Sequence, residues 1–361
     1  MKIFLRKDKV MSKKQCDINT RLGKVGGQAV LEGVMMKSGT TVAVSVRRED
    51  GTISSDVSAF ESARKKHKIL NIPIVRGVVN FAEMLSLSMK TLNKSAELSG
   101  IDEGAEESKF EKWLKAKFGK SVLDIVMGIG LFLGILLAIA LFFLAPNFLA
   151  AQLNKLIPFD AVWQGLFAGI IKIILFILYL YLVSLMKDIR RTFEYHGAEH
   201  KSIFCYEKGE ELTVENVKKQ RRFHPRCGTS FMFVMLFIGM LLSVGVRILI
   251  TYGIGFVIEK TILHTLFYTG INLVILLPLV VGTGYEFLMF AGKHDNVIVR
   301  ILSAPGLWMQ RLTTREPDEK QIEVAIRSLK LAMPDVFPPE ETESGDAPTE
   351  EPTDSAENET L

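Results

Sequence analysis

The reactive side chains of this 361-residue chain gather at the two ends of one polar segment. At its start, His196, Glu199 and His200 form the pattern His-x-x-Glu-His. Histidines four apart project from one face of a helix, where they can bind one divalent metal ion with the glutamate beside them as a base. The pattern is also that of the inverted zincin motif. Gly197 disfavours a helix here, so the motif alone is a weak indication.

The second half of the candidate site lies about 25 residues later, at the other end of the same polar segment. His224 and Cys227 are three apart around Pro225, and imidazole with thiolate is a ligand combination that suits zinc. Long apolar segments flank both ends, so the two halves can meet without ordering a long chain. The sequence predicts a divalent-metal site, with zinc favoured, whose ligands are His196, His200, His224 and Cys227.

Two roles remain open for such a site. Four protein ligands would form a closed structural site, whereas three ligands and a water would leave the open position that catalysis needs. In the open case we expect Glu199 to be the catalytic residue, as general base in a hydrolysis. The competing interpretation has the histidines as interfacial side chains and Cys227 as a small buried residue at a helix start.

Glu286 is a further candidate ligand because it lies near the end of the last apolar segment. Ionisable residues in apolar segments commonly face the interior of a helix bundle and mark function. We therefore predict that Glu286 completes the metal site or orients one of its histidines. The alternative is a salt bridge with Arg226 or Lys293.

Four long apolar segments alternate with charge-rich ones, which explains a mean hydropathy of +0.24 beside 23% charged residues. They cover about 122–145, 163–186, 229–250 and 262–288, and each has the roughly 20 residues that a membrane-spanning helix needs. The predicted fold is a polytopic α-helical membrane protein with four transmembrane helices and a small α+β N-terminal cytoplasmic domain. Pro146 is expected to end the first helix.

The orientation follows from the basic residues of the connections. The segment 187–228 holds ten Lys and Arg, whereas each of the other two connections holds one. By the positive-inside rule, both termini and this central loop face the cytoplasm. Three cysteines, too few for a disulfide framework in a chain of this length, agree with a reducing compartment.

Five regions follow from these boundaries, which are 1–24, 25–120, 121–290, 291–337 and 338–361. The first is a basic arm with eight Lys and Arg, and the second an α+β cytoplasmic region. The third is the membrane domain with its loop 187–228, and the fourth contains two short amphipathic helices on the cytoplasmic face. The last has nine acidic and no basic residues, so we expect a disordered tail.

Within the α+β region, 29–36 and 41–48 are predicted strands, and Glu49-Asp50-Gly51 has the residue types of a hairpin turn. From Ile74 to Leu92, apolar residues recur every three or four positions, which predicts an amphipathic helix. Packing on the small sheet is favoured over lying along the membrane surface.

Small and charged residues inside the apolar segments have separate interpretations. Gly130–Gly134 and Gly165–Gly169 are GxxxG patterns that indicate close helix packing. We expect Arg247 to extend its charged end toward the membrane surface. Lys172 lies deeper and could pair within the bundle, which keeps a transport pathway open as a weaker alternative.

Four motifs together are similar to the YqhQ-like family, bacterial integral membrane proteins of unknown function that are catalogued as predicted metal-dependent enzymes. The motifs are Gly26–Met36, Pro73–Gly77, Tyr195–Lys201 and His224–Thr229, and the resemblance extends over 21–333. It implies a location in the bacterial cytoplasmic membrane and favours a metal at the histidines, but it supplies no substrate. A turn and a strand explain the glycines of the first motif well, and the less favoured alternative is that Glu32 reaches the metal cluster.

Three functions remain in competition. The favoured one is a metal-dependent hydrolase in the lipid bilayer, whose substrate could be membrane-bound, lipid-linked or a peptide, with nothing in the sequence to choose among these. The second is a metal-stabilised adaptor that binds an unknown cytoplasmic protein, and the third is a transporter that uses Lys172, Arg247 and Glu286. No specific nucleic-acid partner is predicted, since basic runs such as Lys218–Arg222 serve equally well as topology signals or lipid contacts.

Overall fold

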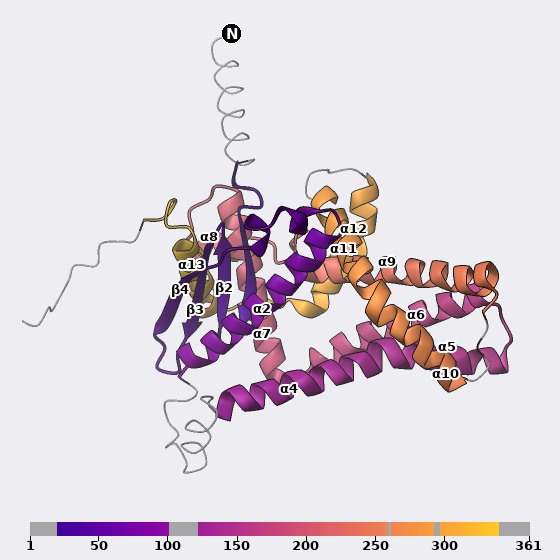
Figure 1. Ribbon diagram of the computed structural model, residues 1–361. Helices are drawn as coiled ribbons and strands as arrows, with labels where there is room; N and C mark the ends of the chain where they lie inside the picture. Colours follow the sequence, from indigo (N-terminus) through magenta and orange to yellow (C-terminus); the bar gives the residue numbers. More distant parts are fainter. Residues whose placement is uncertain (1–19, 101–121, 257, 259–260, 292–296, 339–361) are drawn as a thin grey trace, which may run out of the picture.

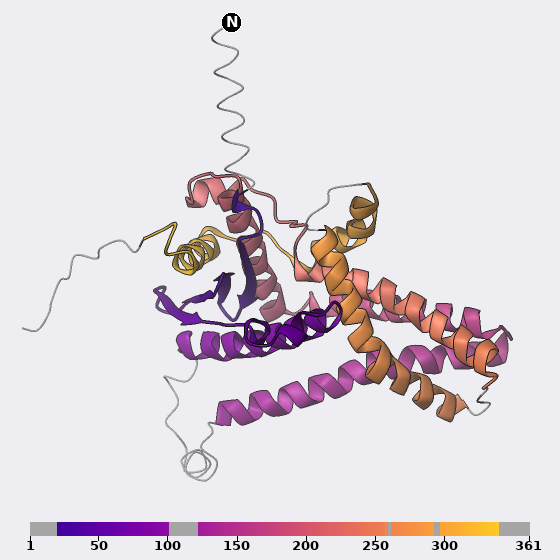
Figure 2. The same ribbon diagram turned by 45° about the horizontal axis from the view of Figure 1, so that its top comes forward.

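The computed structural model describes residues 20–100, 122–256, 258, 261–291 and 297–338 (Figure 1). Most of the predicted basic arm, the segment 101–121 and nearly all of the predicted acidic tail lie outside the described residues. A small sheet with its own helices lies at one end of the molecule, and the long apolar helices extend from it toward the other end (Figures 1 and 2).

The sheet has four antiparallel strands in the order β1-β2-β3-β4. The predicted hairpin at Glu49-Asp50-Gly51 is confirmed, since Arg47 of one strand pairs with Ile53 of the next. The prediction of one strand over 29–36 is wrong, because the chain turns between two strands there. Glu32 takes a φ of 50°, a conformation that glycine adopts more readily, so the strand pattern alone did not locate this turn. The strands are β1 Val25–Val30, β2 Gly33–Ser38, β3 Thr41–Arg47 and β4 Ile53–Ala59.

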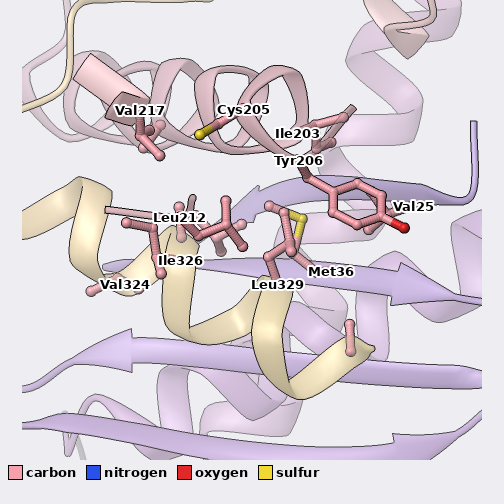
Figure 3. Close-up of a cluster of buried hydrophobic side chains, with 14 of the residues drawn as sticks. Val25, Met36, Ile203, Cys205, Tyr206, Leu212, Val217, Val324, Ile326 and Leu329 are labelled. Atoms are coloured by element: carbon pink, nitrogen blue, oxygen red, sulfur yellow. The ribbon is translucent and has the colours of Figure 1, made fainter. Parts of the chain in front are cut away.

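Side chains alternate along each strand, so the strands present residues to both faces of the sheet. Helices cover both faces. Val42, Val44 and Val46 point to the face that holds Leu87 of α2 (Val75–Leu98). Met36 and Ala43 point to the opposite face, in the core shown in Figure 3. The helices on that face are α7 (Lys187–Glu207), α8 (Val214–Lys218) and α13 (Glu319–Ala332).

Helix α2 follows two short 3-10 segments, Ala63–Lys65 and Lys68–Asn71. It confirms the predicted amphipathic helix and the prediction that this helix packs on the sheet. It also packs against α11 (Leu277–Ala291). A Cβ at Gly77 would lie 2.9 Å from the Cα of Gly282, so the two helices approach backbone to backbone at this point.

Four helices are long and apolar enough to cross a membrane in the described part of the chain, which confirms the predicted number: Gly128–Leu156, Ala161–Val183, Phe231–Ile254 and Thr261–Ala291. Three of them contain a π-helical segment. The first joins α4 (Val122–Ile139) through Ala140–Leu144 to α5 (Ala145–Leu156), and the second is α6 (Ala161–Val183). The third joins α9 (Gly228–Ile248) to Leu249–Ile254, and the fourth joins α10 (Thr261–Ile271) through Asn272–Leu276 to α11.

The expectation that Pro146 ends the first helix is wrong, because the helix continues to Leu156. Pro146 lies in the first turn of α5, directly after the π-helical segment Ala140–Leu144. A proline inside a continuous helix removes one backbone hydrogen bond, and this loss is commonly accommodated where the helical pattern is already irregular. The π-helical segment changes the hydrogen-bond pattern just before the proline and so lets the apolar helix continue.

The central loop 187–228 is largely helical, contrary to the doubt that Gly197 raised. Gly197 lies inside α7, and a Cβ there would lie 2.0 Å from the carbonyl oxygen of Arg315. Close packing, and not a helix break, therefore requires glycine at this position. The two predicted C-terminal helices are confirmed as α12 (Val297–Thr313) and α13.

The two GxxxG patterns have different surroundings. Gly165 and Gly169 pack against α9, where a Cβ at Gly169 would lie 2.2 Å from Met240, so the packing prediction is confirmed there. At Gly130 and Gly134 a Cβ would meet no described atom within 4 Å, so the prediction is wrong within this chain.

The expectation that Arg247 extends toward the membrane surface is also wrong. Its side chain is fully buried. It donates to Asn147 Oδ1 over 2.7 Å and stacks on the ring of Tyr268, with Nη1 3.3 Å from His264 Nε2. Lys172 instead lies over the ring of Phe143. Lys172 and Arg247, two residues of the transporter hypothesis, thus have separate partners.

Candidate metal centre

The candidate site lies where the sheet meets the apolar helices. A cavity of about 760 Å³ opens there, and its walls come from β1, α2, α7, α9 and α11. His196, Glu199, His200, His224 and Cys227 all line it. Helix α7 supplies the first three, and the chain that leads into α9 supplies the other two. The two sequence motifs therefore meet in one cavity.

Two backbone carbonyls orient the histidines of α7. Nδ1 of His196 lies 2.8 Å from the carbonyl oxygen of Thr313, and Nδ1 of His200 lies 2.5 Å from that of Arg222. A carbonyl oxygen can only accept, so each Nδ1 must carry the hydrogen. In the neutral rings this leaves the lone pair on Nε2, which is the arrangement typical of metal-binding histidines.

Cys227 completes a group of three potential ligands. One nitrogen from each of His196 and His200 and the sulfur of Cys227 all lie within 4.8 Å of one another. The Cys227 Sγ is 3.3 Å from His196 Nε2. Two ligands of one tetrahedral zinc ion lie roughly 3.5 Å apart, given the usual Zn–N and Zn–S lengths. The chemistry and spacing of these donors thus fit a zinc ion.

Glu199 is buried beside the three potential ligands. Its Oε2 lies 3.8 Å from His196 Nε2. Burial raises the pKa of the Glu199 carboxyl to about 7, although His196 and the backbone of Gly27 act in the opposite direction. A Cβ at Gly27 would lie 2.8 Å from Glu199 Cγ, so β1 can pass over the carboxylate only with glycine here. Glu199 is placed to accept a proton or to act as a fourth ligand.

His224 lies next to the group of three without joining it. Its ring is 5.6 Å from that of His200, and its Nδ1 accepts from the backbone N–H of Arg226 over 3.3 Å. Its Nε2 therefore carries the hydrogen and faces Glu207 Oε2 at 3.5 Å. Burial lowers the pKa of His224, while Glu207 opposes this shift. In this arrangement His224 supports the site and offers no lone pair to a metal.

Glu207 is the main acidic partner that the sequence analysis missed. It pairs with Arg226 and accepts from the N–H of Gly23 over 3.0 Å. Burial alone would raise its pKa, but these partners and His224 lower it overall. One face of α7 carries His196, His200, Ile203 and Glu207. Recognising α7 as a helix from the sequence would therefore have placed Glu207 on the same face as the candidate ligands.

The structure gives Glu286 other partners than the predicted ones. Arg76 binds both of its oxygens, with Nε 2.7 Å from Oε1, and the backbone N–H of Ile74 donates to Oε1 over 3.3 Å. Glu286 therefore joins the start of α2 to α11 and is not among the converging ligand atoms. The alternative prediction of a salt bridge is correct in the type of interaction, but the partner is Arg76 and not Arg226 or Lys293.

Glu32 does not reach the cluster either. It forms a salt bridge with Arg191, and Tyr195 donates to it over 3.4 Å. These contacts fix the β1–β2 turn on the first half of α7. The turn interpretation of the first sequence motif therefore agrees with the structure.

Comparison with known proteins identifies the family. The family model described as "Protein of unknown function (DUF1385)" matches residues 72–335, which include both halves of the site. The uncharacterized protein YqhQ of Bacillus subtilis (strain 168) is 36% identical over 308 residues, which are 84% of this chain and 90% of that protein. No solved structure matches the chain. The chain thus belongs to the DUF1385 family, together with YqhQ.

Proposed function

We propose that this protein is a metal-dependent hydrolase of the bacterial cytoplasmic membrane, with its active site at the cytoplasmic end of the helix bundle. The observation that carries the proposal is the convergence of His196, His200 and Cys227 in a large cavity, with both imidazoles fixed through Nδ1. Three protein ligands leave a position open, which is the arrangement of catalytic zinc sites.

Different side chains would bind the metal and transfer the proton. His196, His200 and Cys227 would hold the metal, which supplies Lewis acidity near neutral pH when bound. Glu199 would take a proton from a water molecule in the cavity and return it to the leaving group. Because Glu199 is buried beside His196, it needs no movement to reach this position.

The membrane location is supported by the four long apolar helices. The connection between α5 and α6 lies at the end of the bundle away from the sheet (Figures 1 and 2). Ten basic residues lie between α6 and α9, on the side of the sheet, whereas none lies between α5 and α6, where Lys155 in the last turn of α5 is the nearest one. By the positive-inside rule this distribution favours a cytoplasmic location for the sheet and the cavity.

The first experiment is elemental analysis of the untagged protein purified in detergent. We expect close to one zinc ion per chain in the wild type and a loss of at least tenfold in the double variant His196→Ala/His200→Ala. His67→Ala is the matched control, because His67 is exposed and lies outside the cavity. Absence of metal from the wild type, also after reconstitution with zinc, iron or manganese, would refute the proposal.

The second candidate function is a closed structural metal site in a membrane adaptor, which the proximity of Glu199 as a fourth donor favours. Cobalt substitution separates the two candidates. An open site should bind added azide and change the visible cobalt spectrum, whereas a closed four-ligand site should not respond. Glu199→Gln should keep the metal and the azide response if Glu199 is a base, and should alter the cobalt spectrum before azide is added if it is a ligand.

A further inference from the structure

A second cavity, of about 260 Å³, adjoins the site cavity inside the helix bundle. The two share Phe81, Met232, Met235 and Val281 in their walls. We call this second cavity the inner chamber. Three of the four shared residues belong to candidate membrane spans, so the inner chamber lies at the level of the hydrocarbon if the spans are inserted.

The walls of the inner chamber are apolar. Aromatic and aliphatic side chains from α2, α6, α9, α11 and two π-helical segments line it, and the polar exceptions are Lys172 and Asn272. The amide of Asn272 donates to the carbonyl oxygen of Tyr268 on its own helix. Lys172 lies over the ring of Phe143. The chamber is thus suited to a hydrocarbon chain and poorly suited to a polar ligand.

The backbone around the inner chamber is unusual in two places. The π-helical segments Ala140–Leu144 and Asn272–Leu276 both contribute lining residues. Such segments are rare in proteins and occur frequently at functional sites. Gly239 also lines the chamber, and a Cβ there would meet only ordinary contacts, the nearest at 3.5 Å. This glycine therefore leaves space, in contrast to Gly169, which permits close packing.

Polarity changes along the two cavities in one direction. The outer part holds the metal-binding side chains, Glu199 and Thr229. The shared walls are aromatic, methionine and valine side chains, and the inner chamber is apolar. A molecule with a polar head and a single long chain matches this order, with its head at the metal site and its chain in the chamber.

We propose that the substrate is a lipid-like amphiphile, with one acyl or prenyl chain in the inner chamber and its hydrolysable bond at His196, His200 and Cys227. This rests on the proposed hydrolase function. Water is the second reactant: its oxygen forms the new bond to the attacked carbonyl or phosphoryl centre as the bond to the leaving group breaks. Glu199 carries the water's proton to the leaving group, so no oxidant or reductant is needed.

The test uses two forms of palmitic acid as probes, since a fatty acid resembles the product of acyl hydrolysis. One form carries a photoreactive diazirine at the chain end and the other carries it next to the carboxylate. We expect the chain-end probe to label Phe142, Phe176 and Leu276, and the head-group probe to label Phe81 and Met232. Mass spectrometry of the cross-linked full-length protein identifies the labelled residues.

Gly239→Leu fills the inner chamber and should reduce labelling by the chain-end probe at least fivefold. Gly245→Leu is the matched control on the same helix, because Gly245 is exposed and a Cβ there meets no described atom within 4 Å. Gly239→Ala, which adds a single methyl group in ordinary contact, should give an intermediate loss. This graded variant keeps the test decisive if the leucine variant does not fold.

The outcomes separate this inference from the proposed function. Metal in the wild type with chamber labelling that Gly239→Leu blocks supports both. Metal with labelling spread over the exposed residues Leu137 and Leu178, and indifferent to Gly239→Leu, overturns the lipid substrate and leaves the metal site intact. Labelled chamber residues in a protein that binds no metal show a lipid site, but they overturn both the hydrolase and its substrate.

Discussion

At the scale of single residues, the candidate site depends on groups that orient its side chains. The carbonyl oxygens of Thr313 and Arg222 decide which nitrogen of His196 and His200 faces Cys227. These carbonyls carry no signal in the sequence, because every residue type has one. The ligand types could be predicted from the motifs, whereas their tautomers and the exclusion of His224 could not.

The ion pair of Glu207 gives a prediction with a defined dependence on pH. Its lowered pKa means that the carboxylate stabilises the fold above its ordinary pKa of 4.5, and that this stabilisation is lost as the pH falls through the lower folded value. Glu207→Gln should therefore cost about 2 kcal/mol at pH 7, less than the about 3–5 kcal/mol of a fully buried pair, because Arg226 is partly exposed. The difference between the variant and the wild type should therefore shrink as the pH falls below 4.5.

Thermal unfolding in detergent at pH 7 and pH 4 measures this effect. Glu61→Gln, which removes an exposed carboxylate, is the control and should leave the midpoint unchanged. An equal loss for Glu207→Gln at both pH values would mean that the side chain acts through packing and not through its charge.

At the scale of elements, periodicity predicted the helices and strands well where one residue property dominates. The apolar segments and the alternating valines of β3 are examples, since burial alone explains both. The errors lie at Glu32, Pro146 and Gly197, where tertiary contacts override local preference. Three features can be explained only from the residues that pack against them. These are the turn at Glu32, the proline that follows a π-helical segment and the glycine inside a helix.

The two GxxxG patterns allow a matched test of helix packing. Gly169→Leu would force a side chain into Met240 of α9 and should lower the stability by about 1–3 kcal/mol, the usual cost of overpacking. Gly134→Leu adds the same side chain on an exposed face of the first span and should be neutral. Thermal unfolding of both variants in one detergent gives the comparison. A comparable loss for Gly134→Leu would contradict the single-chain interpretation and indicate a partner on that face.

At the scale of the whole molecule, the candidate site belongs neither to the sheet region alone nor to the apolar helices alone. Its cavity has walls from the sheet, from α7 and from two of the apolar helices. The pair Arg76–Glu286 and the close contact of Gly77 with Gly282 hold these parts together. The sequence predicted the two parts and the histidine and cysteine side chains that meet in the cavity, but this junction depends on contacts between residues about 200 positions apart, which local patterns do not report.

Cysteine labelling can test on which side of a membrane the cavity lies. We expect a membrane-impermeant maleimide to label Leu156→Cys in intact right-side-out vesicles, because Leu156 is 81% exposed at the end of α5, away from the sheet. Lys219→Cys, exposed near α8 on the sheet side, should react only after permeabilisation. Both variants carry Cys16→Ser and keep the buried Cys205 and Cys227. The opposite pattern would place the cavity outside the cell and would contradict the cytoplasmic active site of the proposed function.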